Sequence, residues 1–252
     1  MSDNPHRFVD TLEDEQRDLE ALMRSMQAED WSRATPAAGW DICDQFSHLA
    51  DTEEIAHDTV IGGPRTLQAE VVAHQSDGGP IEFGVVKGRA LPAPLVGEWW
   101  IAAAANNRDA LRAVDVSKRV PWGLGMGWRS FVTARLMEHW AHGLDVRAAL
   151  GVASEDTDRL EHIGWICFSA LPYAFQVAGV EAPPGRTLRI DMTGPDGQVW
   201  SYGDTAATDT ISGPAGVWCR RAVQRIALDE ADELVVCGPL AELAVRHARA
   251  FL

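Results

Sequence analysis

The stretch Ser130–Leu150, SFVTARLMEHWAHGLDVRAAL, decides the fold of the first half of the chain. Read as a helix, it carries apolar residues on nearly every side, and a helix of that kind is normally buried. Glu138 and His142 lie inside it, four residues apart and therefore one above the other on the same face. Both side chains need partners there, because an unpaired buried charge is costly. Either a bound divalent metal or an ion pair with a neighbouring helix would supply them.

The composition is that of a globular protein, with 46% hydrophobic and 23% charged residues in a chain of 252. The formal net charge of −15 repels phosphate backbones and anionic lipid, so we expect neither a nucleic acid nor a membrane as a partner. No apolar run is long enough for a signal peptide or a membrane span, which favours a cytoplasmic location. The four cysteines are widely spaced, and we interpret them as small buried hydrophobic residues.

Helical periodicity predicts three more long helices before the motif, at about 5–27, 42–60 and 95–114. Asp41 is placed to cap the second of them. The residues between the second and third, about 61–93, have Gly-Gly-Pro turns and little periodicity, and we expect a long loop in which His74 is solvated. Four helices with long connections predict a bundle whose core could hold a metal.

After Gly151 the pattern changes to short alternating strands and helices. A helix is expected at 158–179, kinked or shortened by Pro172. Strands are expected at 187–192, 199–203, 207–212 and 233–238, with helices opened by Pro214 and Pro239. We therefore predict an α+β protein of two domains. Residues 1–153 form the four-helix bundle, and residues 154–252 form a small α+β domain.

The second helix carries two histidines, His48 and His57, whose nine-residue spacing puts them on opposite faces. We interpret His48 as the inward residue and His57 as a surface residue. With Glu138 and His142, His48 makes a set of two imidazoles and one carboxylate on facing helices, suited to zinc or to nickel or ferrous iron. Three protein ligands leave a coordination position open, which is typical of a working rather than a structural zinc site.

These segments also carry a family resemblance. GWDICDQFSHLADTE (39–53) and RLMEHWAHGLDVRAALG (135–151) resemble the DinB-like metal-binding bundles, in the branch of the mycothiol-dependent maleylpyruvate isomerase N-terminal domain. There a histidine of the second helix and a Glu-x-x-x-His pair of the fourth bind the metal, and they match the three residues named above. TLRIDMTGPDGQVWSYG (187–203) is similar to an actinobacterial subgroup of metal-binding proteins labelled with wyosine base formation. The acidic balance argues against the RNA modification that this label suggests.

The resemblance implies a metal-dependent enzyme that activates a low-molecular-weight thiol such as mycothiol. The thiol then adds to a small electrophilic substrate, for isomerisation or for S-transfer. Zinc is the first expectation for the metal, with nickel or iron as alternatives, and the chain would be a monomer or a homodimer. Two other interpretations stay open: a hydrolase that uses metal-bound water, and a non-catalytic metal-binding or ligand-sensing module.

Several residues near the motif remain open in role. His139 departs from the family pattern and is either a core histidine or a group that supports the ligands. Asp145, one turn after the motif histidine, suits an acceptor for an imidazole N–H or a salt bridge at the helix end. Trp122 or Trp128, in the preceding loop, is expected in the wall of a pocket at the site.

Two arginines of the second half, Arg221 and Arg225, lie on one face of the helix opened by Pro214. In the isomerase branch an arginine of the C-terminal domain helps to bind an anionic substrate. The resemblance does not assign that role to either residue, and a surface role is equally open.

Overall fold

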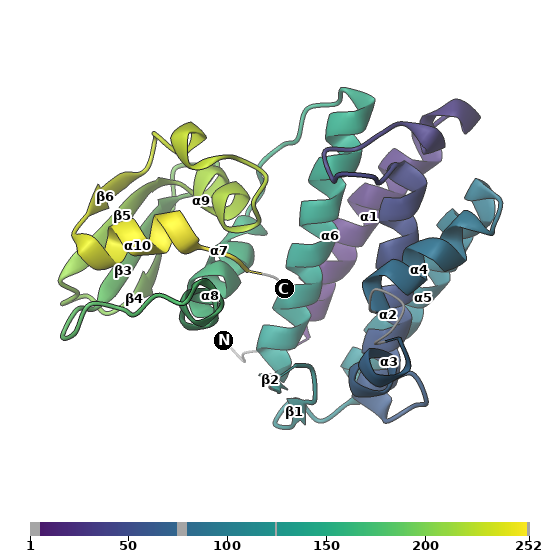
Figure 1. The fold of residues 1–252 in the computed structure, drawn as a ribbon, viewed down its shortest axis with the longest axis horizontal. Helices are drawn as coiled ribbons and strands as arrows, with labels where there is room; N and C mark the ends of the chain where they lie inside the picture. Colours follow the sequence, from purple (N-terminus) through teal and green to yellow (C-terminus); the bar gives the residue numbers. More distant parts are fainter. Residues whose placement is uncertain (1–5, 75–79, 124, 251–252) are drawn as a thin grey trace. The chain divides into compact units, whose positions relative to one another are not determined.

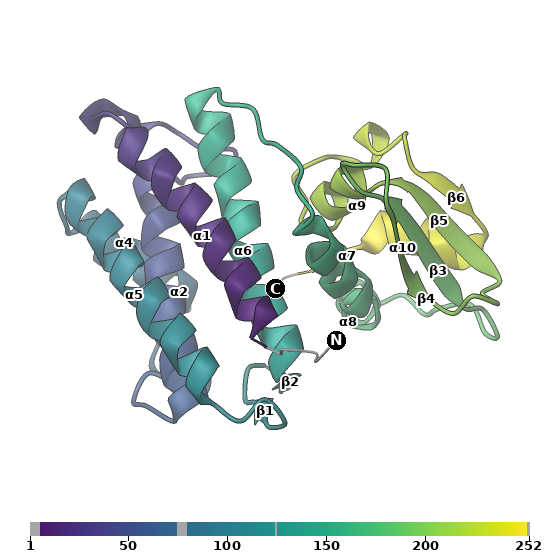
Figure 2. The same cartoon turned by 180° about the vertical axis from the view of Figure 1, so that it is seen from behind.

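The computed structural model describes residues 6–74, 80–123 and 125–250. The chain divides into two compact units, Met1–Ser154 and Glu155–Leu252. The first is helical apart from one short hairpin, and the second is a small mixed sheet with helices, as the predicted α+β class requires (Figures 1 and 2). Within the described ranges, no helix is both long and apolar enough to cross a bilayer.

Four long helices build the first unit: α1 (Arg7–Ser25), α2 (Ile42–Ile61), α5 (Ala93–Ala113) and α6 (Trp128–Leu150). Helix α1 packs on α6, and α2 packs on α5 and also contacts α6 (Figures 1 and 2). Phe46, Trp100 and Val146, from three of these helices, are buried in one hydrophobic cluster. Burial of such large apolar side chains is the main force that holds the helices together.

Helix α2 begins at a well-formed cap. The side chain of Asp41 accepts from the backbone N–H of Asp44 at 2.9 Å, and the Asp44 carboxylate accepts from the backbone N–H of Asp41. This reciprocal pair satisfies two of the donors that a helix start leaves open. Arg89 also donates to the Asp44 carboxylate at 2.7 Å, which ties the helix start to a later part of the chain.

The predicted long loop at 61–93 is wrong, because the described part of it contains α3 (Leu67–Ala73) and α4 (Pro80–Arg89). Helix α4 packs tightly on α2: a Cβ atom at Gly88 would lie 1.8 Å from the Ser47 hydroxyl oxygen. Gly88 is therefore a packing residue, where the absence of a side chain lets the two helices approach. His74 follows α3, and its ring stacks on Phe83 at 3.8 Å with only 15% of the side chain exposed, so it is not solvated. A hairpin of β1 (Arg119–Val120) and β2 (Met126–Gly127) precedes α6.

The second unit contains a four-stranded sheet in the order β4-β3-β5-β6. Strands β3 and β5 pair in parallel, and the other neighbours pair antiparallel. The expected helix at 158–179 is divided at Ala170, two residues before Pro172, into two shorter helices. Ile190, Ile211 and Trp218 are fully buried in this unit. The bounds of its elements are α7 (Leu160–Ser169), α8 (Leu171–Ala178), β3 (Leu188–Thr193), β4 (Val199–Gly203), β5 (Asp209–Pro214), α9 (Ala215–Ala222), β6 (Val235–Cys237) and α10 (Pro239–His247).

Candidate metal centre

Helices α2 and α6 bring the three predicted ligands to one point. One donor atom from each of His48, Glu138 and His142 lies within 4.8 Å of the others. A Glu138 carboxylate oxygen is 3.7 Å from His48 Nε2 and 3.5 Å from His142 Nε2. Ligands about 2.0–2.2 Å from a tetrahedral zinc ion are about 3.4 Å apart, so the donor spacing fits a divalent ion.

The protonation states also suit metal binding. Burial, together with neighbouring His142, lowers the pKa of His48 to about 4, so its imidazole is neutral at pH 7 and keeps a lone pair. Burial alone would raise the pKa of Glu138, but the adjoining imidazoles of His142 and His48 hold it well below its ordinary value. The site therefore offers an ionised carboxylate from Glu138 and a neutral imidazole from His48, and zinc binds donors of both kinds.

Exposure differs among the three side chains. His48 is 7% exposed, His142 is 13% and Glu138 is 20%. His48 is thus embedded in the bundle, while His142 and Glu138 are both partly exposed. His48 Nδ1 is buried without a hydrogen-bond partner among the described residues. An unpaired buried polar atom is costly, so this nitrogen is the least well satisfied atom of the triad.

Two residues beside the triad were not predicted from the sequence. The side-chain oxygen of Gln45 lies 2.5 Å from His142 Nδ1. The Trp40 ring lies 5.2 Å from the His48 ring and is stacked at 6.1 Å on the His142 ring, measured between centroids. Gln45 precedes His48 by three residues on one helix face, and that spacing was the only available signal. Trp40 lies in a loop with no periodicity and gave none.

Residues 12–147 match the mycothiol maleylpyruvate isomerase N-terminal domain, which is more than half of the chain. The chain belongs to this family. Uncharacterized proteins from two strains of Mycobacterium tuberculosis are each 34% identical to it over 249 residues, covering 98% of this chain and 96% of the relative.

Among solved structures, the fold is similar to that of the mycothiol-dependent maleylpyruvate isomerase and of a histidine-to-alanine mutant of that enzyme. The TM-score is 0.61 in both cases, with 92% of each chain covered and 13% sequence identity. At that identity the likeness concerns the fold alone.

This member of the mycothiol maleylpyruvate isomerase family has a second buried polar cluster, next to the triad. Glu53 accepts from Arg135 Nε and from the Asn107 amide, both at 2.6 Å. His139 Nδ1 lies 2.8 Å from the Arg135 carbonyl oxygen, a pure acceptor, so this nitrogen donates. Its Nε2 faces the Trp100 indole N–H at 3.2 Å and the Gln16 amide nitrogen at 3.1 Å. The lone pair of His139 is therefore already used, and the residue is a core histidine.

Asp145 is buried but is not the acceptor of a triad imidazole, because Gln45 occupies that position at His142. Trp128 is also in the core, 3% exposed, with its indole N–H donated to the Leu111 carbonyl oxygen at 3.1 Å. Trp128 is thus a core residue, and the expectation that Trp122 or Trp128 lines a pocket stays a prediction. Packing of this ring at the first turn of α6 explains why it is buried.

Other candidates lie outside the triad. His57 is paired with its neighbour Asp58 at 3.0 Å and is 30% exposed. In the second unit, Arg221 is buried and donates to the carbonyl oxygen of Arg246 at 2.7 Å. Burial lowers its pKa. Arg225 donates to the Val223 carbonyl oxygen at 2.8 Å.

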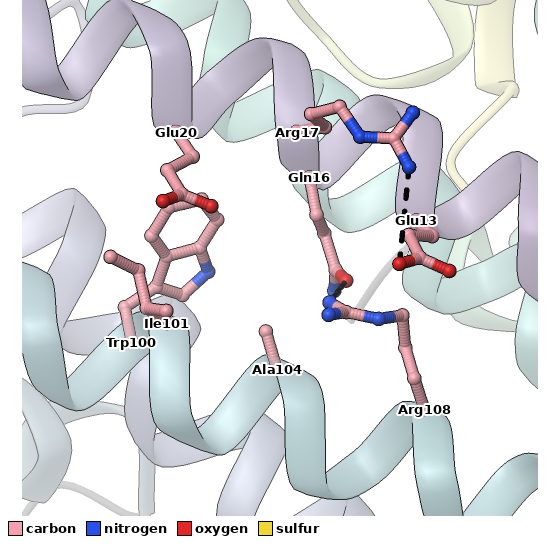
Figure 3. Close-up of a pocket in the computed structure, with 8 residues that line it drawn as sticks. All are labelled: Glu13, Gln16, Arg17, Glu20, Trp100, Ile101, Ala104 and Arg108. Carbon is pink, nitrogen blue, oxygen red and sulfur yellow. Dashed lines mark hydrogen bonds and ion pairs between the residues drawn. The ribbon is translucent and has the colours of Figure 1, made fainter.

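A cavity of about 80 Å³ lies in the first unit between α1 and α5 (Figure 3). Gln16 and Arg108 point toward each other across it and are hydrogen-bonded. Its walls contain none of the triad residues. The cavity therefore adjoins the second polar cluster and not the candidate metal site. Its lining residues are Glu13, Gln16, Arg17, Glu20, Trp100, Ile101, Ala104 and Arg108.

Proposed function

We propose that this protein is a metal-dependent enzyme that activates a low-molecular-weight thiol, mycothiol or a similar compound, for isomerisation of or S-transfer to a small electrophile. The observation that carries the proposal is the convergence of His48, Glu138 and His142 on one point. Membership of a family named for a mycothiol-dependent isomerase supports the choice of thiol.

The residues present divide the work of holding an ion. Each imidazole would donate a ring-nitrogen lone pair, and Glu138 would supply the anionic oxygen of the triad. A divalent ion would keep a net positive charge with this set, which favours an anionic fourth ligand. When bound there, zinc would lower the pKa of a coordinated thiol so that it reacts as a thiolate near neutral pH.

The surroundings of the triad support the same chemistry. Trp40 lies against both imidazole rings and keeps water from their faces, while the partly exposed Glu138 marks the side that a ligand reaches. Exclusion of water strengthens the attraction between the ion and an anionic sulfur. The triad would therefore hold the ion, Trp40 would shield it from water, and the side near Glu138 would stay open to a ligand.

The test begins with metal analysis of protein purified without a histidine tag. Mycothiol is then titrated into zinc-loaded and metal-stripped protein, and the expected result is binding that depends on zinc. Glu138→Gln keeps the side-chain shape but removes the anionic ligand, so it should weaken both zinc and thiol binding. Equal thiol affinity with and without zinc would overturn the thiol mechanism. A panel of electrophiles then distinguishes an enzyme from a binding module.

A further inference from the structure

Three hydrogen bonds connect His142 to the loop before α2. His142 Nδ1 lies 2.5 Å from Gln45 Oε1, and the Gln45 amide nitrogen donates to the Thr35 hydroxyl at 2.9 Å. The Thr35 hydroxyl in turn donates to the Trp40 carbonyl oxygen at 2.9 Å. Gln45 is fully buried, so water does not compete for these contacts.

The order of donors along this chain determines where the proton of the imidazole lies. A backbone carbonyl oxygen can only accept, so the Thr35 hydroxyl donates its hydrogen to the Trp40 carbonyl oxygen. The Thr35 oxygen then accepts from the Gln45 amide nitrogen, and this turns the Gln45 carbonyl oxygen toward His142. Because that oxygen can also only accept, His142 Nδ1 must carry the hydrogen. The lone pair is left on Nε2, the nitrogen that faces Glu138.

We propose that Gln45, held by Thr35, is a positioning residue that sets the tautomer and ring orientation of His142 for a divalent metal. The proposal rests on the proposed function only in taking the triad as the metal site. Stacking of Trp40 on the His142 ring, with 18° between the two planes, limits rotation of the same imidazole. Groups that orient a ligating histidine in this way commonly change metal affinity 10–100-fold when they are removed.

The other imidazole of the triad lacks such a support. Among the described residues, His48 Nδ1 has no hydrogen-bond partner. The two histidines are therefore not equivalent before a metal arrives. The Nδ1 of His142 is held by Gln45, whereas the Nδ1 of His48 is held by no described residue.

The first test uses metal-free protein, so it does not depend on activity. Nitrogen NMR of the imidazole rings reports which nitrogen of His142 carries the hydrogen. We expect the Nδ1–H form in the unsubstituted protein and its loss, or a mixture of forms, in Gln45→Leu. The Nε2–H form in the unsubstituted protein, or an unchanged tautomer in Gln45→Leu, would overturn the proposal.

The second test measures zinc affinity by competition with a chromophoric chelator. Gln45→Leu should lower the affinity about 10–100-fold. Gln45→Glu offers only acceptor oxygens, so it keeps Nδ1–H in place and should bind zinc near the original affinity, although its contact with Thr35 is lost. A purely structural role for Gln45 predicts instead that both variants lose affinity alike. Thr35→Val should lower the affinity less than Gln45→Leu does.

Gln16→Leu is the matched control. Gln16 is also a buried glutamine that contacts a histidine of α6, but that histidine is His139. We expect Gln16→Leu to leave zinc affinity unchanged, and an equal loss in both glutamine variants would refute the positioning role. Zinc binding without thiol binding would defeat the proposed function while leaving this inference standing. Absence of zinc binding would refute zinc binding at the triad, which the proposed function and this inference both require. The tautomer measurement would still decide whether Gln45 orients His142.

Discussion

Helix α6 takes part in two buried polar clusters built from the same kinds of residue. In one, His142 and Glu138 meet His48 and Gln45 of α2. In the other, His139 and Arg135 meet partners that include Glu53 of α2. Each cluster thus contains an α6 histidine, a carboxylate and a glutamine, which is Gln16 in the second cluster. The arrangement of these groups nevertheless differs between the two clusters.

The difference lies in how the lone pairs are used. In the second cluster the carboxylate and the imidazole are paired with donors: Glu53 accepts from an arginine and an amide, and His139 Nε2 faces an indole N–H and an amide nitrogen, while the Asn107 side-chain oxygen has no partner among the described residues. In the triad, the donor atoms face one another across distances too long for hydrogen bonds. A cluster whose carboxylate and imidazole are paired with donors stabilises the fold, whereas lone pairs that converge without donors are suited to a cation.

The largest expected effect comes from breaking the second cluster. Glu53→Gln leaves Arg135 buried at 3% exposure without a charged partner. Removing one member of a buried ion pair typically costs about 3–5 kcal/mol, so the free energy of unfolding in denaturant should fall by that order. A negligible change in stability would show that this cluster is not structural.

The next effect concerns the triad. His142→Ala removes a candidate ligand and should lower zinc affinity more than the roughly 100-fold seen at most for supporting groups, measured by chelator competition. The metal-free protein should lose less stability than Glu53→Gln does, since His142 is partly exposed. His57→Ala, on the opposite face of α2, is the control and should change neither quantity. Retention of zinc by His142→Ala would place the site elsewhere.

The smallest effect is a difference in pH dependence. Burial lowers the pKa of His139 to about 4 from an ordinary value of 6.5. Between those values the unfolded chain binds more protons than the folded protein, so stability falls as the pH is lowered. In metal-free protein, the share from His139 between pH 7 and pH 5 is about 2 kcal/mol. His139→Gln can keep one donor and one acceptor, and should flatten the slope of unfolding free energy against pH; an unchanged slope would contradict a neutral buried imidazole.

Much of the fold followed from local patterns. Apolar periodicity located the four long helices, and alternation located the strands of the second unit, because each pattern reflects the face that its element buries. Helix α4 was missed because Gly-Gly-Pro turns and weak periodicity favoured a loop, whereas the helix is held by close packing on α2 at Gly84 and Gly88. Such a contact depends on two segments distant in sequence, and no local pattern reports it.

The candidate site likewise has a part that local sequence patterns predict and a part that depends on contacts between distant segments. Glu138 and His142 are four residues apart on one helix, and His48 is the inward histidine of another, so helical geometry and the family motif were enough to propose that they meet. The contact of Gln45 with His142 joins residues 97 positions apart and depends on how the two helices are rotated. Asp145, which is nearer in sequence, was left open between an acceptor and a salt bridge, and Gln45 is the residue at Nδ1 of His142.

The sequence separations within these clusters also bear on how the protein folds. The contact between Glu53 and Arg135 spans 82 residues, and that between Gln45 and His142 spans 97. Closing such long loops costs chain entropy, and the stabilising contacts form only after closure. Both clusters should therefore form late in folding, after the local helical turns. A metal ion that joins α2 to α6 would then act as a reversible crosslink between segments far apart in the sequence. It would stabilise the folded protein and raise the melting temperature as the free metal concentration exceeds its dissociation constant.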